Sequence, residues 1–325
     1  MGEFSIIDRY FKNIGKSRQE IIEGPGDDAA VVRMGNSEWT ICADTMVSGV
    51  HFFDSQDAFD VGFKCLAVNL SDTIAMGATP VWAILCLTHP DGNEDWIGRF
   101  SDGFHELAEK SAVSLIGGDT TSGPLTVSVT VGGQLYGPPV LRSGAGVGDI
   151  IFLSNTVGDA AVGLKIAQGE YEASEMDRKA CLEKLNRPYP DLSYVSPLCK
   201  FASAAIDISD GLLADLGHIL TASGGVGAKL DLSTIPMSHA AKNYLTNNGQ
   251  ASENWQTILS GGDDYILCFC VPRNQIENLE TQFPNIQLFR IGEIVEQTGI
   301  EVQNAPAGLI LSQRTGFDHF TKNEL

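Results

Sequence analysis

The chain alternates strand-like and helix-like segments in two blocks, separated by residues 136–149, which are rich in glycine and proline. In the first block the pattern predicts strands at 29–34, 38–43, 80–88, 113–117 and 124–136, with helices at 57–76 and 94–111. In the second it predicts strands at 150–154, 204–208, 226–231, 265–271 and 286–293, with helices at 157–168, 175–186, 210–222 and 273–283. Two such blocks predict an α/β or α+β fold in two domains, which we place at residues 1–143 and 144–325.

The chain is strongly acidic. Its 325 residues include 21 Lys and Arg against 41 Asp and Glu, a formal net charge of −20. This charge argues against a surface that binds the phosphates of nucleic acid or an anionic membrane. With 43% hydrophobic residues, each of two domains can bury a full core.

Seven cysteines lie mostly within apolar runs and lack the C-x-x-C spacing of zinc or thioredoxin-like sites. They are typical of buried free thiols in a reducing cytosol. The N-terminus has no basic region followed by a long apolar stretch, and no window is apolar enough to span a membrane. We therefore expect a soluble, cytoplasmic protein.

Aspartates recur beside glycines at the ends of the predicted strands. The stretch GPGDD at 24–28 is the first, and later ones hold Asp44, Asp119, Asp207, Asp210, Asp263 and Asp264, while Asp72 lies on the predicted helix at 57–76, three residues after Asn69. Singly, each is explained by turn formation or helix capping. As a set, carboxylates that meet at one edge of a sheet would repel one another unless cations lay among them. Oxygen ligands without a His or Cys cluster indicate Mg²⁺ rather than zinc.

A magnesium site of this kind usually joins carboxylates to substrate phosphates. The GGD turns offer backbone N–H groups with no side chain in the way, and we expect the helix beginning at 210 to present an N-terminal anion site. A very acidic protein can then bind a nucleotide through metals. The GKS at 15–17 is not a P-loop because the required glycine falls on Tyr10, and GAGVGD at 144–149 is interpreted as a linker.

Seven stretches occur together and in order: GPGDDAAVV, ADTMVSGVHF, KCLAVNLSDTIAMGATP, IGGDTTSGPL, AIDISDGLLADLGHI, SGGDDYILCF and GFDHF. The ordered set resembles the thiamine-monophosphate kinase family, part of the aminoimidazole-ribonucleotide-synthetase-like ATP-binding superfamily. The resemblance covers residues 3–320. It implies an N-terminal mixed sheet with helices, similar to the N-terminal domain of aminoimidazole ribonucleotide synthetase, and a C-terminal α/β domain of the same superfamily.

The resemblance also implies an activity: ATP-dependent phosphorylation of thiamine monophosphate to thiamine diphosphate, the last step of thiamine diphosphate synthesis, by a homodimer paired through its N-terminal domains. By position it implies magnesium ligands at Asp28, Asp44, Asp72, Asp119 and Asp207, with Asp210 holding a further ion. It places ATP contacts at Gly118, Asp119, Arg142 and Ser209. It places contacts with thiamine monophosphate at His51, Asp263 and Phe317.

The sequence departs from the family pattern in two places. Cys42 and Ala43 stand where family members often have hydroxyl residues, so Ala43 can offer a metal only its backbone carbonyl. Asp263 replaces a glutamate, which shortens the reach toward the substrate by one methylene.

The chemistry of the expected reaction needs no general base. A phosphate monoester has a second pKa of about 6, so the acceptor oxygen is already largely ionised near neutrality. The task is to bring two polyanions into line. Arg142 could stabilise charge on the transferring phosphoryl group or form a surface ion pair. Phe317 could stack on the cationic thiamine ring or anchor the C-terminal tail in the core, and a lone histidine such as His51 is more often structural.

Two alternatives stay open. A selenophosphate-synthetase-like enzyme of the same superfamily would need a reactive cysteine in an N-terminal glycine-rich loop, and no cysteine precedes Cys42. A non-catalytic protein that binds metal or thiamine phosphate would bind divalent ions without forming ADP.

Overall fold

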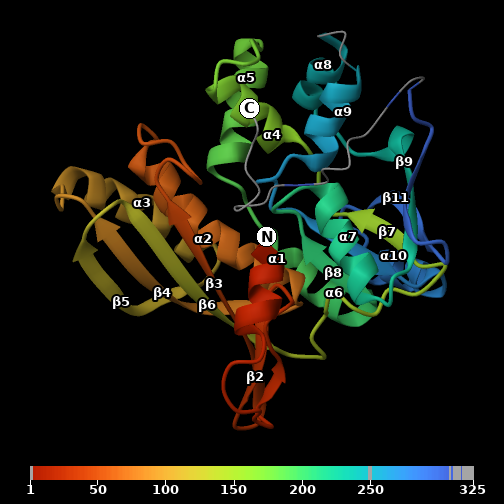
Figure 1. Cartoon of the computed structure of the whole chain (residues 1–325), viewed down its shortest axis with the longest axis horizontal. Helices are drawn as coiled ribbons and strands as arrows, with labels where there is room; N and C mark the ends of the chain where they lie inside the picture. The colour runs from red at the N-terminus through yellow and green to blue at the C-terminus, as the bar shows by residue number, and fades with distance from the viewer. Residues whose placement is uncertain (1–2, 248–250, 307–308, 310–315, 317–325) are drawn as a thin grey trace.

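A computed structural model of the chain describes residues 3–247 and 251–306, together with residues 309 and 316. It contains two six-stranded sheets that lie side by side, with helix α2 (Ala58–Ala75) between them (Figure 1). None of the helices within these described residues is both long and apolar enough to cross a membrane.

The first sheet has the strand order β1-β2-β3-β6-β4-β5. Its strands are β1 (Ile21–Glu23), β2 (Ala30–Met34), β3 (Ser37–Val47), β4 (Thr79–His89), β5 (Ser114–Ser122) and β6 (Thr126–Leu135). Only β4 and β5 run parallel. Helices α2 and α3 (Glu94–Lys110) cover one face (Figure 1), and a short α1 (Glu3–Ile6) with a π-helical turn (Ile7–Phe11) precedes the sheet.

The second sheet has the order β12-β9-β11-β7-β10-β8. Its strands are β7 (Ile150–Leu153), β8 (Ala204–Asp207), β9 (Gly227–Asp231), β10 (Leu267–Val271), β11 (Phe289–Val295) and β12 (Gly299–Gln303). Only β9 and β12 are parallel. Its helices are α4 (Asp159–Ala167), α5 (Glu175–Asn186), α6 (Val195–Phe201), α7 (Leu212–Ala222), α8 (His239–Asn247), α9 (Ala251–Ser260) and α10 (Ile276–Gln282).

The second sheet is buried on both faces. Along β10, Leu267, Phe269 and Val271 belong to the core that continues into the first half, whereas Cys268 and Cys270 point into a separate core under α4, α7 and α9. Successive side chains of a strand point to opposite faces, so a strand buried on both sides is apolar at every position. The unbroken run LCFCV follows from this requirement.

Helix α2 joins the two halves. It packs on β3 and β6 of the first sheet and also contacts β8 of the second. Leu70 and Ile74 of α2 share one hydrophobic core with Phe152 and Phe269 of the second half. A helix enclosed in this way is buried around most of its circumference, and its polar residues must therefore find partners inside the protein.

The α/β character and the mixed sheets expected from the sequence are confirmed. Two local predictions were wrong: β3 and β5 extend further than their apolar runs, so Asp44 and Asp119 lie inside strands rather than after them. Small and polar residues continue a strand when the neighbouring strand pairs with them, as β6 does with Asp44. The pattern also missed α6, α8, α9, β1 and β12, which are short or weakly periodic.

Close packing of α2 against α3 requires glycine at defined positions. A Cβ atom at Gly103 would lie 1.9 Å from the carbonyl oxygen of Phe59, whereas one at Gly98, on the same helix, would meet nothing within 4 Å. We expect Gly103→Ala to lower the free energy of unfolding by about 2 kcal/mol or more, because the helices must separate. Gly98→Ala should raise it by up to about 1 kcal/mol through helix propensity. Urea unfolding of both variants tests this, and equal effects would contradict it.

Candidate metal and phosphate site

Three carboxylates from distant parts of the sequence meet where the two halves join. Asp28 precedes β2, Asp72 lies on α2, and Asp207 ends β8. One oxygen from each lies within 4.8 Å of the others. Asp28 and Asp207 are buried, and Asp72 is half-buried. The sequence predicted all three as metal ligands, and the tertiary structure brings them together.

The cluster is electrostatically strained in the absence of cations. Burial, and then repulsion from Asp28, raises the pKa of Asp207 to about 8. Burial also raises the pKa of Asp28 to about 6, partly offset by Arg142. The pKa of Asp72 is raised well above its ordinary value by burial and by the charges of Asp44 and Asp207. Shifts in this direction show that the fold disfavours the ionised forms.

Arg142 supplies part of the missing positive charge. Its Nε and Nη2 donate to Asp28 Oδ1 at 3.0 and 2.5 Å, and its backbone N–H donates to Asp27 Oδ2 at 3.0 Å. The Arg142 side chain is only 15% exposed, so this is a buried pair rather than a surface one. One guanidinium cannot balance three carboxylates.

The chemistry of the donors fits a hard divalent cation. Within the described part of the chain, Asp28 Oδ2 and Asp207 Oδ2 are buried and have no hydrogen-bond partner. Buried polar atoms normally have partners, so two orphan carboxylate oxygens in one cluster indicate a missing one. Three carboxylates without a nitrogen or sulfur ligand favour Mg²⁺.

Asp44 borders this cluster. Its backbone N–H donates to Asn69 Oδ1 of α2 at 3.0 Å, and burial raises the pKa of its carboxyl group, an effect that the neighbouring Asp72 carboxyl group partly offsets. Cys42, two residues earlier on the same face of β3, is buried and donates its thiol to the Asn69 carbonyl at 3.3 Å. Cys42 therefore helps to hold β3 against α2. Ala43 points to the opposite, exposed face.

Asp119 does not join the cluster in this structure. It lies on edge strand β5, and the register places Gly118 level with Leu85 of β4, Val129 of β6 and Asp44 of β3. Three strand spacings separate β3 from β5, or about 14 Å. Asp119 is exposed, one residue further along, and so points to the other face of the sheet.

Gly118 has a packing explanation of its own. Its φ is +152°, and a Cβ atom there would lie 1.7 Å from the carbonyl oxygen of Leu85. Glycine is therefore required for β5 to pair with β4, whatever else the residue does.

The loop before α7 contradicts one expectation. The helix begins at Leu212, and the N–H groups of Ser209, Asp210 and Gly211 donate to a single oxygen, Asp215 Oδ2, at 3.0–3.1 Å. Asp215 lies in the first turn of the same helix, so a carboxylate of the protein itself occupies the expected anion site. The sequence analysis missed Asp215, although an acidic residue in a first helical turn is a recognised capping signal.

The second acidic turn holds two aspartates with different surroundings. Asp264 is buried and accepts hydrogen bonds from Gly158 and Ala160 at the start of α4, which makes it a structural cap. Asp263 pairs with Lys64 of α2, whose Nζ lies 3.0 Å from its Oδ1. Lys64 was missed by the sequence analysis, although a lysine inside the apolar run of a core helix is an available signal.

Two further predicted residues lie outside the cluster. The Nδ1 atom of His51 accepts a hydrogen bond from the Val47 N–H at 3.0 Å, so His51 stabilises the turn after β3. Phe317 lies outside the described residues.

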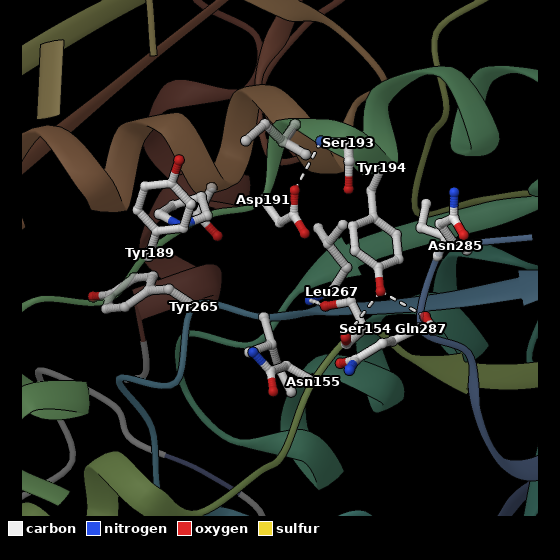
Figure 2. Close-up of a pocket in the computed structure, with 15 residues that line it drawn as sticks. Ser154, Asn155, Tyr189, Asp191, Ser193, Tyr194, Tyr265, Leu267, Asn285 and Gln287 are labelled. Atoms are coloured by element: carbon white, nitrogen blue, oxygen red, sulfur yellow. Dashed lines mark hydrogen bonds between the residues drawn. The ribbon is translucent and has the colours of Figure 1, made fainter. Parts of the chain in front are cut away.

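A pocket of about 360 Å³ opens beside the cluster, between α2 and the second half. Figure 2 shows Tyr189 and Tyr265 on one side of it and Tyr194 on the other. The Tyr194 hydroxyl donates to the carbonyls of Ser154 and Gln287. Asp191 contributes a carboxylate, and no Lys, Arg or His lines the pocket among the residues described. This lining suits a neutral or cationic ring better than a phosphate.

Comparisons with known proteins agree with this geometry. A family model described as AIR synthase related protein, N-terminal domain, matches residues 26–135, and its C-terminal counterpart matches residues 146–304. A relative from Salmonella typhimurium, named thiamine-monophosphate kinase, is 44% identical over 274 residues, 83% of each chain.

Two solved structures share the whole fold. A thiamine-monophosphate kinase from Stenotrophomonas maltophilia has a TM-score of 0.77 at 42% identity and covers 94% of this chain and 98% of its own. A structure described as AaThiL complexed with AMPPCP and TMP has a TM-score of 0.85 at 31% identity, covering 98% and 97%.

The raised pKa values predict how magnesium and pH act together. Burial raises the pKa of Asp28 from 3.8 to about 6 and that of Asp207 from 3.8 to about 8, so the folded state binds more protons than the unfolded state between pH 3.8 and about 8. Stability of the metal-free protein should therefore fall as pH rises from about 4 to about 8. In thermal unfolding, Mg²⁺ should raise the Tm by at least about 3 °C more at pH 8.5 than at pH 5.5, relative to EDTA.

The variant Asp207→Asn provides the control for this experiment. It removes the carboxyl group with the pKa of about 8, so the dependence on pH should shrink. An equal effect of Mg²⁺ at both pH values in the unmodified protein would contradict the assignment.

Proposed function

The chain belongs to the AIR synthase related proteins and, within them, to the thiamine-monophosphate kinase family, and we propose that it transfers the terminal phosphoryl group of ATP to thiamine monophosphate, giving ADP and thiamine diphosphate. The observation that carries the proposal is the cluster of Asp28, Asp72 and Asp207, a candidate cation site at the seam between the halves. Phosphoryl transfer between two anions needs such a site.

The related solved structure supports both substrates. AMPPCP is an analogue of ATP, and TMP is the abbreviation of thiamine monophosphate in this family. The same fold therefore accommodates a nucleotide and this acceptor together. A non-catalytic binding protein is less well supported, because the relatives that span most of the chain are named as kinases.

The residues of the chain have positioning roles in this reaction. Asp28, Asp44, Asp72 and Asp207 would hold Mg²⁺, which neutralises phosphate charge and orients the reacting groups when bound. An ionised oxygen of the acceptor phosphate attacks the γ-phosphorus of ATP as the bond to the ADP oxygen breaks. Because that oxygen is already deprotonated near neutral pH, no side chain is assigned as a base.

Contacts with the substrates extend the proposal. We assign Arg142, Gly118, Asp119 and Ser209 to ATP, with Asp210 holding a further ion. Arg142 keeps free N–H donors while two of its nitrogens are paired with Asp28, so it could contact a phosphate without leaving that pair.

His51, Asp263 and Phe317 are assigned to the acceptor. The cationic ring of thiamine fits the acidic surroundings of Asp263.

The oligomeric state and compartment complete the proposal. Strand β5 forms the edge of the first sheet, all nine of its residues are exposed, and Leu115 and Ile116 are 51% and 60% exposed. An open strand edge that exposes two large apolar side chains favours pairing with another chain, so we propose a homodimer joined through the first domains. Seven free cysteines favour a reducing, cytoplasmic compartment.

The family models match on either side of the gap between residues 135 and 146. This supports a domain boundary at residues 143 and 144, which we retain as a proposal.

The direct test is phosphorus NMR of the purified protein with MgATP, with and without thiamine monophosphate. We expect ADP and thiamine diphosphate in equal amounts, only with the acceptor present, and neither after EDTA. Asp72→Asn should lower kcat at least about 100-fold, or about 2.7 kcal/mol, because it removes a ligand charge. Asp102→Asn, exposed on α3, should leave kcat unchanged.

Two outcomes would count against the proposal. ADP and free phosphate without thiamine diphosphate would indicate an ATPase or a different acceptor. Binding of divalent metal with no ADP at all would indicate a binding protein.

The dimer proposal is tested by light scattering after gel filtration. Ile116→Glu should halve the measured mass, because the charge lies at the proposed interface. Met176→Glu provides the control, since Met176 is 68% exposed on α5 of the second half and should tolerate the charge. A wild-type mass equal to that of one chain would contradict the proposal.

A further inference from the structure

Helix α2 places a lysine in the interior. The side chain of Lys64 is 3% exposed, its Nζ lies 3.0 Å from Asp263 Oδ1, and it lies 5.9 Å from the centre of the Tyr265 ring. A buried ammonium group is unfavourable unless it is paired, so these contacts stabilise its position. They also join α2 of the first half to a turn of the second.

That turn has an unusual backbone. Asp263 and Tyr265 have φ values of +71° and +48°, in the left-handed region that side chains with a Cβ rarely adopt. Such conformations cost about 1 kcal/mol or more each and persist only where surrounding contacts hold them.

One side of the turn is held by the backbone. The N–H of Asp263 donates to the Ser209 carbonyl at 2.9 Å, and that of Tyr265 donates to the Ile208 carbonyl at 2.8 Å. Both partners follow directly after Asp207 of the carboxylate cluster. On the other side, the Lys64 side chain contacts the Asp263 carboxylate and the Tyr265 ring.

The exposure of the two partners differs. Asp263 is 34% exposed, whereas Lys64 is enclosed. A ligand in the site can therefore reach the carboxylate but not the ammonium group. Lys64 consequently acts on a ligand through the position that it gives to Asp263 and Tyr265.

We propose that Lys64 is a positioning residue for the acceptor, because it fixes Asp263 and Tyr265 where the heteroaromatic cation of the acceptor binds. The inference rests on the proposed function. An aspartate at 263 reaches one methylene less far than a glutamate, so its contact with the acceptor depends strongly on where the turn is held. Arg142 is paired with Asp27 and Asp28 instead, so loss of Lys64 should affect the acceptor more than ATP.

The test is a double-mutant cycle of Lys64→Met and Asp263→Asn, with KM measured separately for each substrate. Each single variant should raise the KM for thiamine monophosphate about tenfold, and the double variant should raise it by much less than the product of the two effects, because Lys64 acts on the acceptor mainly through Asp263. The KM for ATP should change less than about twofold, which separates positioning from a general loss of structure.

Two further variants complete the design. Lys110→Met is a matched control, because Lys110 pairs with Glu106 and lies 5.9 Å from the Phe63 ring, yet it is exposed. It should leave both KM values unchanged. Asp263→Glu keeps a carboxylate and should retain a KM for the acceptor within about threefold of wild type. If Lys64→Met does not fold, Lys64→Gln, which also removes the charge but keeps a polar end group, takes its place in the same cycle.

Several results would overturn the inference. These are a double variant whose rise in KM for thiamine monophosphate equals the product of the two single rises, an equal rise in the KM values for both substrates, or no effect of either change on the KM for thiamine monophosphate. If the wild-type protein forms no thiamine diphosphate, the proposed function fails separately. The inference is then decided by calorimetric binding of thiamine monophosphate to the same proteins, where absence of binding or of coupling rejects it.

Discussion

Repulsion among buried carboxylates is the constraint on which this structure depends. Asp28, Asp72 and Asp207 come from a loop, a helix and a strand end, and the fold holds them within 4.8 Å of one another at the seam of its two halves. Arg142 offsets only part of their charge. Such a cluster is retained where a cation or ligand supplies the missing positive charge. We therefore expect the functional site where the electrostatic energy of the ligand-free structure is least favourable.

Helix α2 makes this arrangement possible. It lies between the sheets, and three of its polar residues make contacts outside the helix. Asn69 fixes β3, Asp72 joins the cluster, and Lys64 reaches the turn at 263–265. Enclosure on most sides raises the energetic importance of every polar contact, because no water replaces a lost partner. The same helix thus provides both the shared core and the alignment of the site.

Several acidic residues that look equivalent in the sequence have different roles. Asp215 and Asp264 bind backbone N–H groups and stabilise loops, whereas Asp28, Asp72 and Asp207 keep oxygens free of such partners or face one another. The presence of backbone donors distinguishes structural carboxylates from those available to a cation. Within one chain, Asp119 is neither a structural carboxylate of this kind nor a member of the cluster, because the strand order places it on an exposed edge of the sheet.

The sequence alone determined the alternating strand and helix pattern, the acidic character and the set of candidate aspartates, because hydrophobic period and turn chemistry are local properties. The ordered motifs also identified the family. Only the tertiary structure decided which aspartates meet. It also decided that the Asp215 carboxylate accepts the free N–H groups at the start of α7, and that Lys64 pairs with Asp263, 199 residues away. These relations depend on strand order, on register and on the contact between the two halves. Such long-range geometry leaves no local pattern in a single sequence.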